Sequence, residues 1–316
     1  MKLEAITTVY SYRFPEVRKL ITDLTNPFPH EVFLKSVQPV GGLDNFHESI
    51  IEKVMNFYSG SVNLQNFNFR YPTSGSSEGI FHYLSLLRKN GAQKIYTLKG
   101  EYEGYREYGK TIGLKTVEVD PNTNPKHLEK GIWFISNPSA RDGNIIPNQF
   151  INDICEAGHK VFYDLAYMGS TRQNKFDLSN ENIAAAVISF SKPYGVFYDR
   201  VGFIFSKEEI PSLYANKWFK NILSLMIAEK IVLELKPEEI YKKYKPVQEQ
   251  IIREINREFG LGIKASDALL LGYLTKKRAE NLNSQQRELI QKFQRGDFYR
   301  FCLTPYFVNM EKENGK

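Results

Sequence analysis

The sequence predicts an α/β fold with a mostly parallel central sheet. Short apolar runs rich in β-branched and aromatic residues recur between residues 95 and 205. These runs do not alternate with polar residues, which is typical of strands buried on both faces. Segments with helical periodicity separate several of the runs, and this alternation favours a parallel sheet covered by helices.

The elements can be assigned in chain order. We predict strands at residues 95–98, 114–119, 132–135, 160–163, 186–189 and 201–205. A helix is expected at residues 77–88, because its apolar positions share one face, and another at 149–157, because Pro147 favours a helix start. The first ~40 residues lack periodicity and are predicted to be irregular.

The end of the chain has a different pattern. Residues 208–292 are predicted to be helical, with breaks near Gly260 and Gly262, and a last strand is predicted at residues 298–303. A chain of 316 residues is long enough for a large domain and a smaller one. We expect residues 45–206 to form the large domain. Residues 1–44 and 207–316 are then expected to form connecting helices and a small, discontinuous α+β domain.

Composition favours a soluble cytoplasmic protein. The chain is 42% hydrophobic and 25% charged, and no stretch approaches the ~20 apolar residues of a membrane span. Cys155 and Cys302 lack metal-ligand spacing, so we expect reduced, buried thiols and no metal. The net charge of +6 comes from scattered lysines and arginines, so we expect neither a nucleic acid nor a membrane as partner.

A lysine and an arginine flank a turn between two apolar runs. Lys192 follows one predicted strand, and Arg200 precedes the next. Lysines are rarely buried without a partner, and a partly desolvated lysine has a lowered pKa and acts as a nucleophile. An arginine offers two parallel N–H donors to a phosphate.

Other polar residues also follow predicted strands. Asp164 ends the strand at 160–163, where ligands of open α/β sheets gather, and a carboxylate there can hold a pyridinium nitrogen protonated. Asn137 follows the strand at 132–135, and Tyr102 follows that at 95–98. The Ser-rich start of the helix at 77–88 can bind an anion through its free N–H groups, although plain capping explains it equally well.

Taken in order, these motifs resemble a known family. The set Gly-Ser-Ser-Glu-Gly, Tyr-x-x-Tyr, Asn-Pro, Asp-x-Ala-Tyr and Ser-x-Ser-Lys-x7-Arg-x-Gly resembles the fold type I pyridoxal-phosphate (PLP) enzymes. It is most similar to class I/II aminotransferases of the histidinol-phosphate aminotransferase kind. The resemblance covers residues 71–206 well and both ends loosely. It implies the PLP-dependent transferase fold type I, with PLP bound to the large domain.

The resemblance also implies roles for individual residues. Lys192 would carry PLP as a Schiff base, Asp164 would pair with the ring nitrogen, and Tyr167 would complete the catalytic set. Asn137 and Tyr167 would hydrogen-bond the ring hydroxyl oxygen, while Tyr102 would stack on the ring. The phosphate would be held by Ser76, Ser77, Ser189, Ser191 and Arg200. Arg300 matches the family's clamp for the substrate carboxylate.

The implied function is an aminotransferase acting on an amino acid and a 2-oxo acid, as a homodimer. A decarboxylase, lyase or amino-acid-modifying enzyme on the same fold remains the alternative, because sequence hardly shows which Cα bond breaks. The chain is shorter than usual for the family, and the usual Asn-Pro-Thr-Gly turn here runs from Asn137 to Gly143. Tyr102 could instead be a packing residue, and Arg300 an exposed arginine at a strand edge. Arg141 is either a substrate contact or an exposed loop residue.

Overall fold

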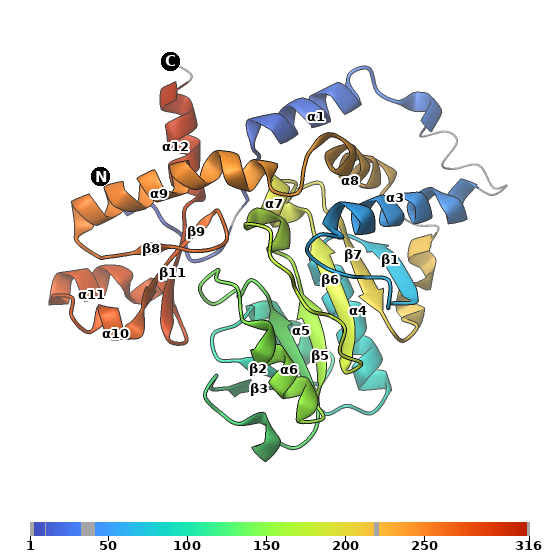
Figure 1. The fold of residues 1–316 in the computed structure, drawn as a ribbon, viewed down its shortest axis with the longest axis horizontal. Helices are drawn as coiled ribbons and strands as arrows, with labels where there is room; N and C mark the ends of the chain where they lie inside the picture. Colours follow the sequence, from blue (N-terminus) through green and yellow to red (C-terminus); the bar gives the residue numbers. More distant parts are fainter. Residues whose placement is uncertain (1–2, 10, 33–41, 218–220, 315–316) are drawn as a thin grey trace.

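A computed structural model describes residues 3–9, 11–32, 42–217 and 221–314. It contains a seven-stranded sheet in the order β1-β7-β6-β5-β4-β2-β3 and a four-stranded sheet in the order β10-β11-β9-β8. Figure 1 shows the two sheets on different sides of the molecule, with helices around each.

The larger sheet is mostly parallel, as predicted. Its strands are β1 (Phe69–Thr73), β2 (Lys94–Leu98), β3 (Lys115–Val119), β4 (Ile132–Ser136), β5 (Lys160–Asp164), β6 (Ile183–Ser189) and β7 (Gly202–Ser206). Only β7 runs antiparallel to its neighbours, β1 and β6. Strand β1 was not predicted. It contains Pro72, and the structure places it at the sheet edge, where proline is tolerated.

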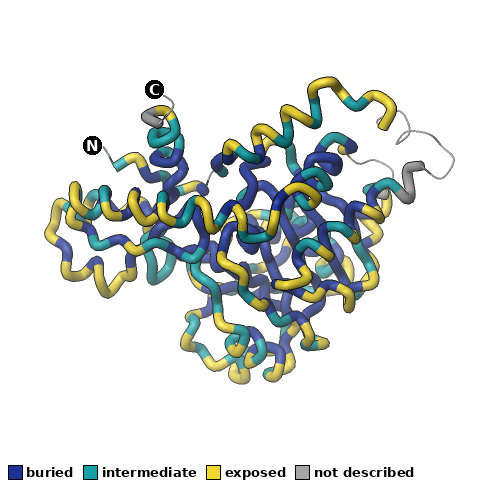
Figure 2. The backbone as a smooth tube through the Cα atoms, turned by 45° about the horizontal axis from the view of Figure 1, so that its top comes forward, coloured by how far each residue is buried: buried dark blue, intermediate teal, exposed yellow. Residues whose placement is uncertain are grey.

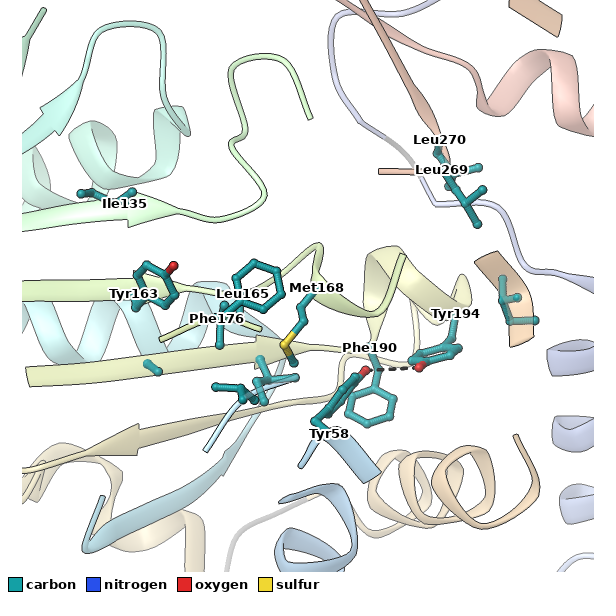
Figure 3. Close-up of a cluster of buried hydrophobic side chains, with 14 of the residues drawn as sticks. Tyr58, Ile135, Tyr163, Leu165, Met168, Phe176, Phe190, Tyr194, Leu269 and Leu270 are labelled. Carbon is teal, nitrogen blue, oxygen red and sulfur yellow. Dashed lines mark hydrogen bonds between the residues drawn. The ribbon is translucent and has the colours of Figure 1, made fainter. Parts of the chain in front are cut away.

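Helices cover both faces of this sheet. They are α3 (Gly42–Tyr58), α4 (Ser76–Lys89), α5 (Glu103–Thr111), α6 (Asn148–Glu156), α7 (Ser191–Tyr194) and α8 (Ile222–Glu234). Alternate residues along β4 enter different cores: Phe134 joins the core beneath α4 and α5, whereas Trp133 and Ile135 join the core beneath α3 and α6. Figure 2 shows buried residues concentrated in the sheet, and Figure 3 shows part of the second core around Tyr58 and Tyr194.

Two predictions about the chain ends are wrong. Within the region predicted to be irregular, α1 (Pro15–Thr25) is a helix that begins with proline at its first turn. Within the region predicted to be helical, β8 (Lys264–Ala265) and β9 (Leu271–Thr275) are strands. The apolar run at 269–274 was ambiguous between helix and strand; β9 pairs with β11 (Phe298–Cys302), and this long-range pairing decides its conformation.

The remaining elements lie beside one of the two sheets or between them. They are η1 (Pro125–His127), η2 (Met168–Ser170), η3 (Pro211–Lys217), α9 (Glu239–Phe259), α10 (Lys276–Ala279), α11 (Ser284–Ile290), η4 (Gln291–Phe293), β10 (Gln294–Arg295) and α12 (Thr304–Asn314). Ile6 forms an antiparallel bridge with Cys302, so the N-terminal segment lies against the smaller sheet. The domain limits of 45 and 206 remain a prediction.

Among the residues that the structure describes, no helix combines the length and the apolar character needed to cross a membrane. Cys155 and Cys302 are both buried, as expected, and neither takes part in a disulfide within the described residues.

Candidate active site

Strand register brings the predicted residues to one edge of the larger sheet. Asp164, the last residue of β5, pairs with Ser136 on β4 and with Val187 on β6. Ser189, the last residue of β6, pairs with Gly202 on β7. The carboxyl ends of the parallel strands therefore converge, as in other open α/β sheets, and the segments that follow them build the site.

Lys192 lies in the short helix α7, directly after β6. Its side chain is partly buried, and its Nζ contacts the carbonyl oxygen of Val9 in the N-terminal segment. The pKa of Lys192 is lowered to about 8, mainly by desolvation and also by the positive charges of Arg300 and Arg200, against an opposing effect of Cys302. A neutral amine is therefore much more accessible here than on an exposed lysine.

The guanidinium of Arg200 contacts serines at the starts of two helices. Its Nη2 donates to Ser77 Oγ and to the Ser74 carbonyl oxygen, both at 2.8 Å, and its Nη1 lies 3.5 Å from Ser191 Oγ. Ser191 N–H in turn donates to Ser189 Oγ at 3.2 Å. Arginine, hydroxyl groups and free helix N–H groups are the donors that bind phosphate in proteins.

Gly75 leaves the space for this cluster. It precedes α4 with a φ of 81°, and a Cβ placed on it would lie 2.6 Å from Nη2 of Arg200. No side chain caps α4 at this position, so its first N–H groups, including those of Ser76 and Ser77, face the cluster without a competing cap. The start of α4 is thus suited to an anion as well as to the arginine.

Asp164 is a buried carboxylate with hydrogen bonds but no cation. Its Oδ2 accepts from the hydroxyl of Tyr105 at 2.8 Å, and its Oδ1 accepts from Ala166 N–H at 3.0 Å. Burial raises its pKa to about 6, against the lowering effect of these two donors. Within the described residues, no lysine or arginine forms an ion pair with Asp164, so a protonated ring nitrogen would supply the missing positive charge.

The two aromatic residues predicted for the ring differ in exposure. Tyr102 is 38% exposed and stands edge-on to Tyr105, with 5.3 Å between the ring centroids, so part of its ring is free to stack. Tyr167 is buried and packs with Ala140 and Cys302. Burial raises the pKa of Tyr167 to about 12, so its hydroxyl is protonated and can donate at neutral pH.

The side-chain amide of Asn137 has no unused hydrogen to donate to the cofactor ring. Its Nδ2 donates to the Ile146 carbonyl oxygen at 2.9 Å and to Tyr163 Oη at 2.7 Å, while its Oδ1 accepts from Ile146 N–H at 2.9 Å. Both amide hydrogens are therefore used. In this arrangement Asn137 cannot donate to the ring oxygen as expected, unless one of these bonds is released.

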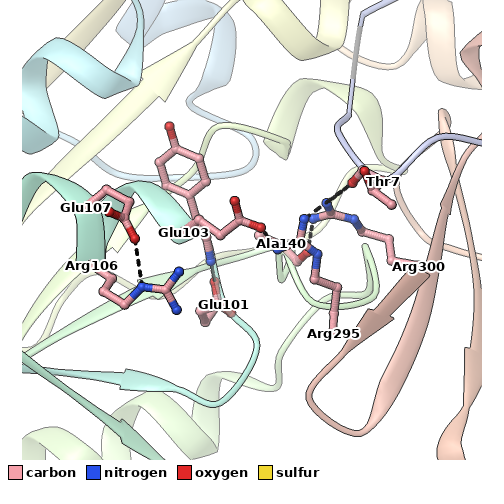
Figure 4. A network of polar contacts seen from close by, with 9 residues as sticks. Thr7, Glu101, Glu103, Arg106, Glu107, Ala140, Arg295 and Arg300 are labelled. Atoms are coloured by element: carbon pink, nitrogen blue, oxygen red, sulfur yellow. Dashed lines mark hydrogen bonds and ion pairs between the residues drawn. The ribbon is translucent and has the colours of Figure 1, made fainter. Parts of the chain in front are cut away.

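Arg300 is buried, not exposed at a strand edge. It projects from β11 toward the larger domain, where its Nη1 donates to the Ala140 carbonyl oxygen and its Nη2 donates to that of Thr7 at 2.7 Å (Figure 4). Its Nε has no partner among the described residues. A buried guanidinium held by carbonyl oxygens lacks a counter-charge, which suits it to an anionic ligand. Arg141 is also buried, with its guanidinium carbon 5.0 Å from the centre of the Phe298 ring.

Three contributors to the site were missed from the sequence. Tyr105 was noticed only as part of a motif, and its bond to Asp164 joins residues that are 59 positions apart. Glu101 follows β2 by three residues, and its place shortly after a buried strand was the available signal. The segment that provides Thr7 and Val9 carried no signal at all.

The arrangement fits the cofactor that the resemblance implies. The Arg200 cluster provides donors for a phosphate, and the cradle at Gly75 has no room for a side chain. Asp164 provides a buried negative charge for a ring nitrogen, and Lys192 provides an amine of lowered pKa. These chemistries match phosphate, pyridine and aldehyde, three of the polar groups of PLP.

Comparison with known proteins points the same way. The family model for aminotransferase class I and II matches residues 14–234. Similar curated proteins include the histidinol-phosphate aminotransferases of Thermotoga neapolitana, 24% identical over 201 residues, and Thermotoga maritima, 24% identical over 178 residues. The matches cover 60% and 54% of this chain, and 58% and 51% of those relatives. The chain thus matches little more than half the length of these curated relatives.

Solved structures with a similar fold cover nearly the whole chain. Aspartate aminotransferase from Thermus thermophilus, solved with maleate, has a TM-score of 0.71 at 13% identity and covers 98% of this chain and 90% of its own. L-threonine-O-3-phosphate decarboxylase from Porphyromonas gingivalis has a TM-score of 0.64 at 16% identity and covers 99% of both chains. Histidinol-phosphate aminotransferase from Sinorhizobium meliloti, in complex with PLP, has a TM-score of 0.68 at 13% identity and covers 94% and 84%.

Proposed function

Because the chain belongs to the aminotransferase class I and II family, we propose that it is an aminotransferase that moves an amino group between an amino acid and a 2-oxo acid. Its cofactor is PLP. The observation that carries the proposal is the partly buried Lys192, whose pKa is lowered to about 8 between two arginines that suit a phosphate and a carboxylate.

The proposed cofactor contacts follow the geometry. The phosphate would be held by Ser76, Ser77, Ser189, Ser191 and Arg200. Asp164 would hold the ring nitrogen, Tyr102 would stack on the ring, and Tyr167 would donate to the ring oxygen. Asn137 would join Tyr167 only after releasing Ile146 or Tyr163. When bound, PLP withdraws electrons from the Cα of the substrate and so weakens its bonds.

The chain's own residues then have defined tasks. Lys192 Nζ would hold the cofactor and, once released from it, would accept the proton from the substrate Cα and later give it up again. Asp164 would keep a proton on the ring nitrogen, because its buried carboxylate has no ion pair within the described residues. Arg300 would bind the substrate carboxylate through N–H donors that its bonds to the carbonyl oxygens of Ala140 and Thr7 leave unused, Nε among them.

Reductive trapping tests this proposal. Borohydride treatment of the PLP-loaded protein should leave a pyridoxyl group on the peptide that contains Lys192. The Lys192→Ala protein should fold, carry no label and lose most turnover. Lys245→Ala is a matched control, because burial also lowers the pKa of Lys245, yet this lysine is bonded to Gln248 and Ser266. Label on another lysine, or no label, would contradict the assignment.

A decarboxylase on the same fold is the second candidate. It is favoured by the length of this chain, which the Porphyromonas gingivalis decarboxylase structure matches over 99% of both chains. A panel of amino acids with labelled carboxyl carbon separates the two functions. An aminotransferase converts its substrate to a 2-oxo acid that keeps the label, whereas a decarboxylase releases labelled CO₂. We also propose a cytoplasmic homodimer, as the resemblance implies; sedimentation velocity of the PLP-loaded protein tests the dimer.

A further inference from the structure

Glu101 is a buried carboxylate for which the proposed function has no role. It lies three residues after the end of β2, with 5% of its surface exposed. Ser136 Oγ donates to its Oε2 at 2.5 Å, Ser139 Oγ donates to its Oε1 at 2.9 Å, and Tyr102 N–H donates to Oε2 at 3.2 Å. It forms no ion pair within the described residues. A buried carboxylate without an ion pair is costly, so three converging donors indicate a specific task.

The two serines connect Glu101 to the turn formed by residues 136–141. Ser136 Oγ accepts from Ala140 N–H at 2.6 Å, and Ser139 Oγ accepts from Arg141 N–H at 3.2 Å. Each hydroxyl therefore gives its hydrogen to Glu101 and accepts a backbone N–H from the turn. Glu101 thereby determines which way both hydroxyls point and how the turn closes.

The same turn carries the principal contact of Arg300. The carbonyl oxygen of Ala140 accepts from Arg300 Nη1, and the two residues come from the larger and the smaller sheet regions. Figure 4 shows Ala140 beside the guanidinium of Arg300, with Glu101 farther from it. A continuous series of buried hydrogen bonds therefore links Glu101, through the serines and the turn, to the proposed carboxylate clamp.

We propose that Glu101 is a positioning residue for the substrate-carboxylate site: its carboxylate holds the turn 136–141 in the form that places Arg300. The inference rests on the proposed function, because it takes Arg300 as the clamp. Glu101 contacts neither the reacting atoms nor the cofactor in this role. It acts on substrate binding and leaves the capture of PLP by Lys192 unchanged.

The role requires the ionised form. A carboxylate accepts all three donors, whereas a protonated acid must donate one bond, and one serine hydroxyl then has to turn away. Burial raises the pKa of Glu101 to about 7, against the lowering effects of Ser136, Ser139 and Arg141. The other titratable groups that face it are Tyr105 and Tyr167, and both stay protonated in the physiological range. Glu101 thus changes charge near neutral pH while its surroundings do not.

Steady-state kinetics of the PLP-loaded protein test the proposal. Glu101→Gln keeps the shape but cannot accept three donors, so the KM for amino acids should rise about 10-fold with kcat within about 2-fold of wild type. Amines that lack a carboxylate should react as with wild type. The wild-type KM should rise as the pH falls through about 7, and the variant should lose this dependence. Glu103→Gln is the matched control, because Glu103 is a nearby glutamate that pairs with Arg295 on the surface.

A second variant keeps the test valid if Glu101→Gln folds poorly. Ser139→Ala removes one donor that lowers the pKa of Glu101, so the midpoint of the KM profile should move to higher pH. An unchanged midpoint, or a Glu101→Gln protein that slows both substrate types equally, would overturn the inference. Pyridoxyl labelling of Lys192 separates the two levels of failure. Absence of label contradicts the proposed function, whereas normal label with an unchanged KM contradicts only the role of Glu101.

Discussion

The hydroxyl of Tyr105 donates a hydrogen bond of 2.8 Å to Oδ2 of Asp164, and both side chains are buried. The bond stabilises the charged form of a carboxylate that burial would otherwise neutralise, because burial alone raises its pKa and the Tyr105 donor lowers it. Asp164 can hold a ring nitrogen protonated only while it remains charged. If Asp164 has the proposed role, Tyr105 therefore acts on the cofactor ring through Asp164.

Removing this donor should raise the pKa of Asp164 above its value of about 6. In Tyr105→Phe, a larger fraction of Asp164 is then protonated at pH 7, and the activity that requires its charge is lost at a higher pH than in wild type. We expect kcat at pH 7 to fall roughly 10-fold, from the loss of one charge-assisted hydrogen bond. The measurement is the pH profile of kcat. Tyr96→Phe is the control, because its hydroxyl bonds to the Glu129 carbonyl oxygen instead of Asp164; an equal shift in both variants would contradict the assignment.

The lowered pKa of Lys192 predicts how the apoprotein captures PLP. Only the neutral amine attacks an aldehyde, and its fraction rises with pH until the pKa is passed. The initial rate of PLP incorporation should therefore reach half its plateau near pH 8, well below the 10.5 of an ordinary lysine. Stopped-flow absorbance across pH 6 to 10 measures this. A lysine-containing peptide under the same conditions corrects for ionisation of PLP itself, and a protein profile equal to that of the peptide would refute the prediction.

Arg300 should discriminate substrates by their carboxylate. Arg300→Lys keeps the charge but loses the paired N–H donors. The activation free energy derived from kcat/KM for amino acids should therefore rise by roughly 2–4 kcal/mol, while PLP binding stays intact. The kcat/KM for amines without a carboxylate should change little. Arg295→Lys is the control, because Arg295 pairs with Glu103 and donates only at long range, 3.5 Å, to the Thr7 carbonyl oxygen. Equal losses for both substrate types would exclude Arg300 as the clamp.

Alanine variants of two glycines distinguish backbone strain from a steric effect at the proposed phosphate site. Gly75 and Gly91 both have a positive φ, but a Cβ on Gly75 would lie 2.6 Å from Arg200 Nη2, whereas a Cβ on Gly91 would meet nothing within 4 Å. Each alanine variant should lose about 1 kcal/mol of stability from strain. Only Gly75→Ala should also bind PLP more weakly, with an affinity lower by roughly 10-fold or more, because the new methyl group displaces Arg200. Equilibrium dialysis measures the affinity, and thermal unfolding of the apoproteins measures the strain.

Several features were determined by sequence alone because they depend on local patterns. Buried parallel strands must be continuous apolar runs, so the strands from β2 to β7 could be located before the structure was known. A polar residue directly after such a run must lie at the sheet edge. That rule was enough to single out Lys192 and Asp164, and Arg200 was proposed for a phosphate from its place across the turn from Lys192. The serines came from the family resemblance, and the structure brings Ser77 and Ser191 to Arg200.

Other features were decided only by tertiary structure, because their energies come from groups far apart in the chain. The apolar run of β9 became a strand because β11 was available to pair with it. The amide of Asn137 was taken up by Ile146 and Tyr163, which no motif could reveal. Tyr105, Glu101 and the carbonyl oxygens of Thr7 and Val9 reached the site through folding. A buried charge must find its partners wherever the fold brings them, so spacing along the sequence cannot identify them.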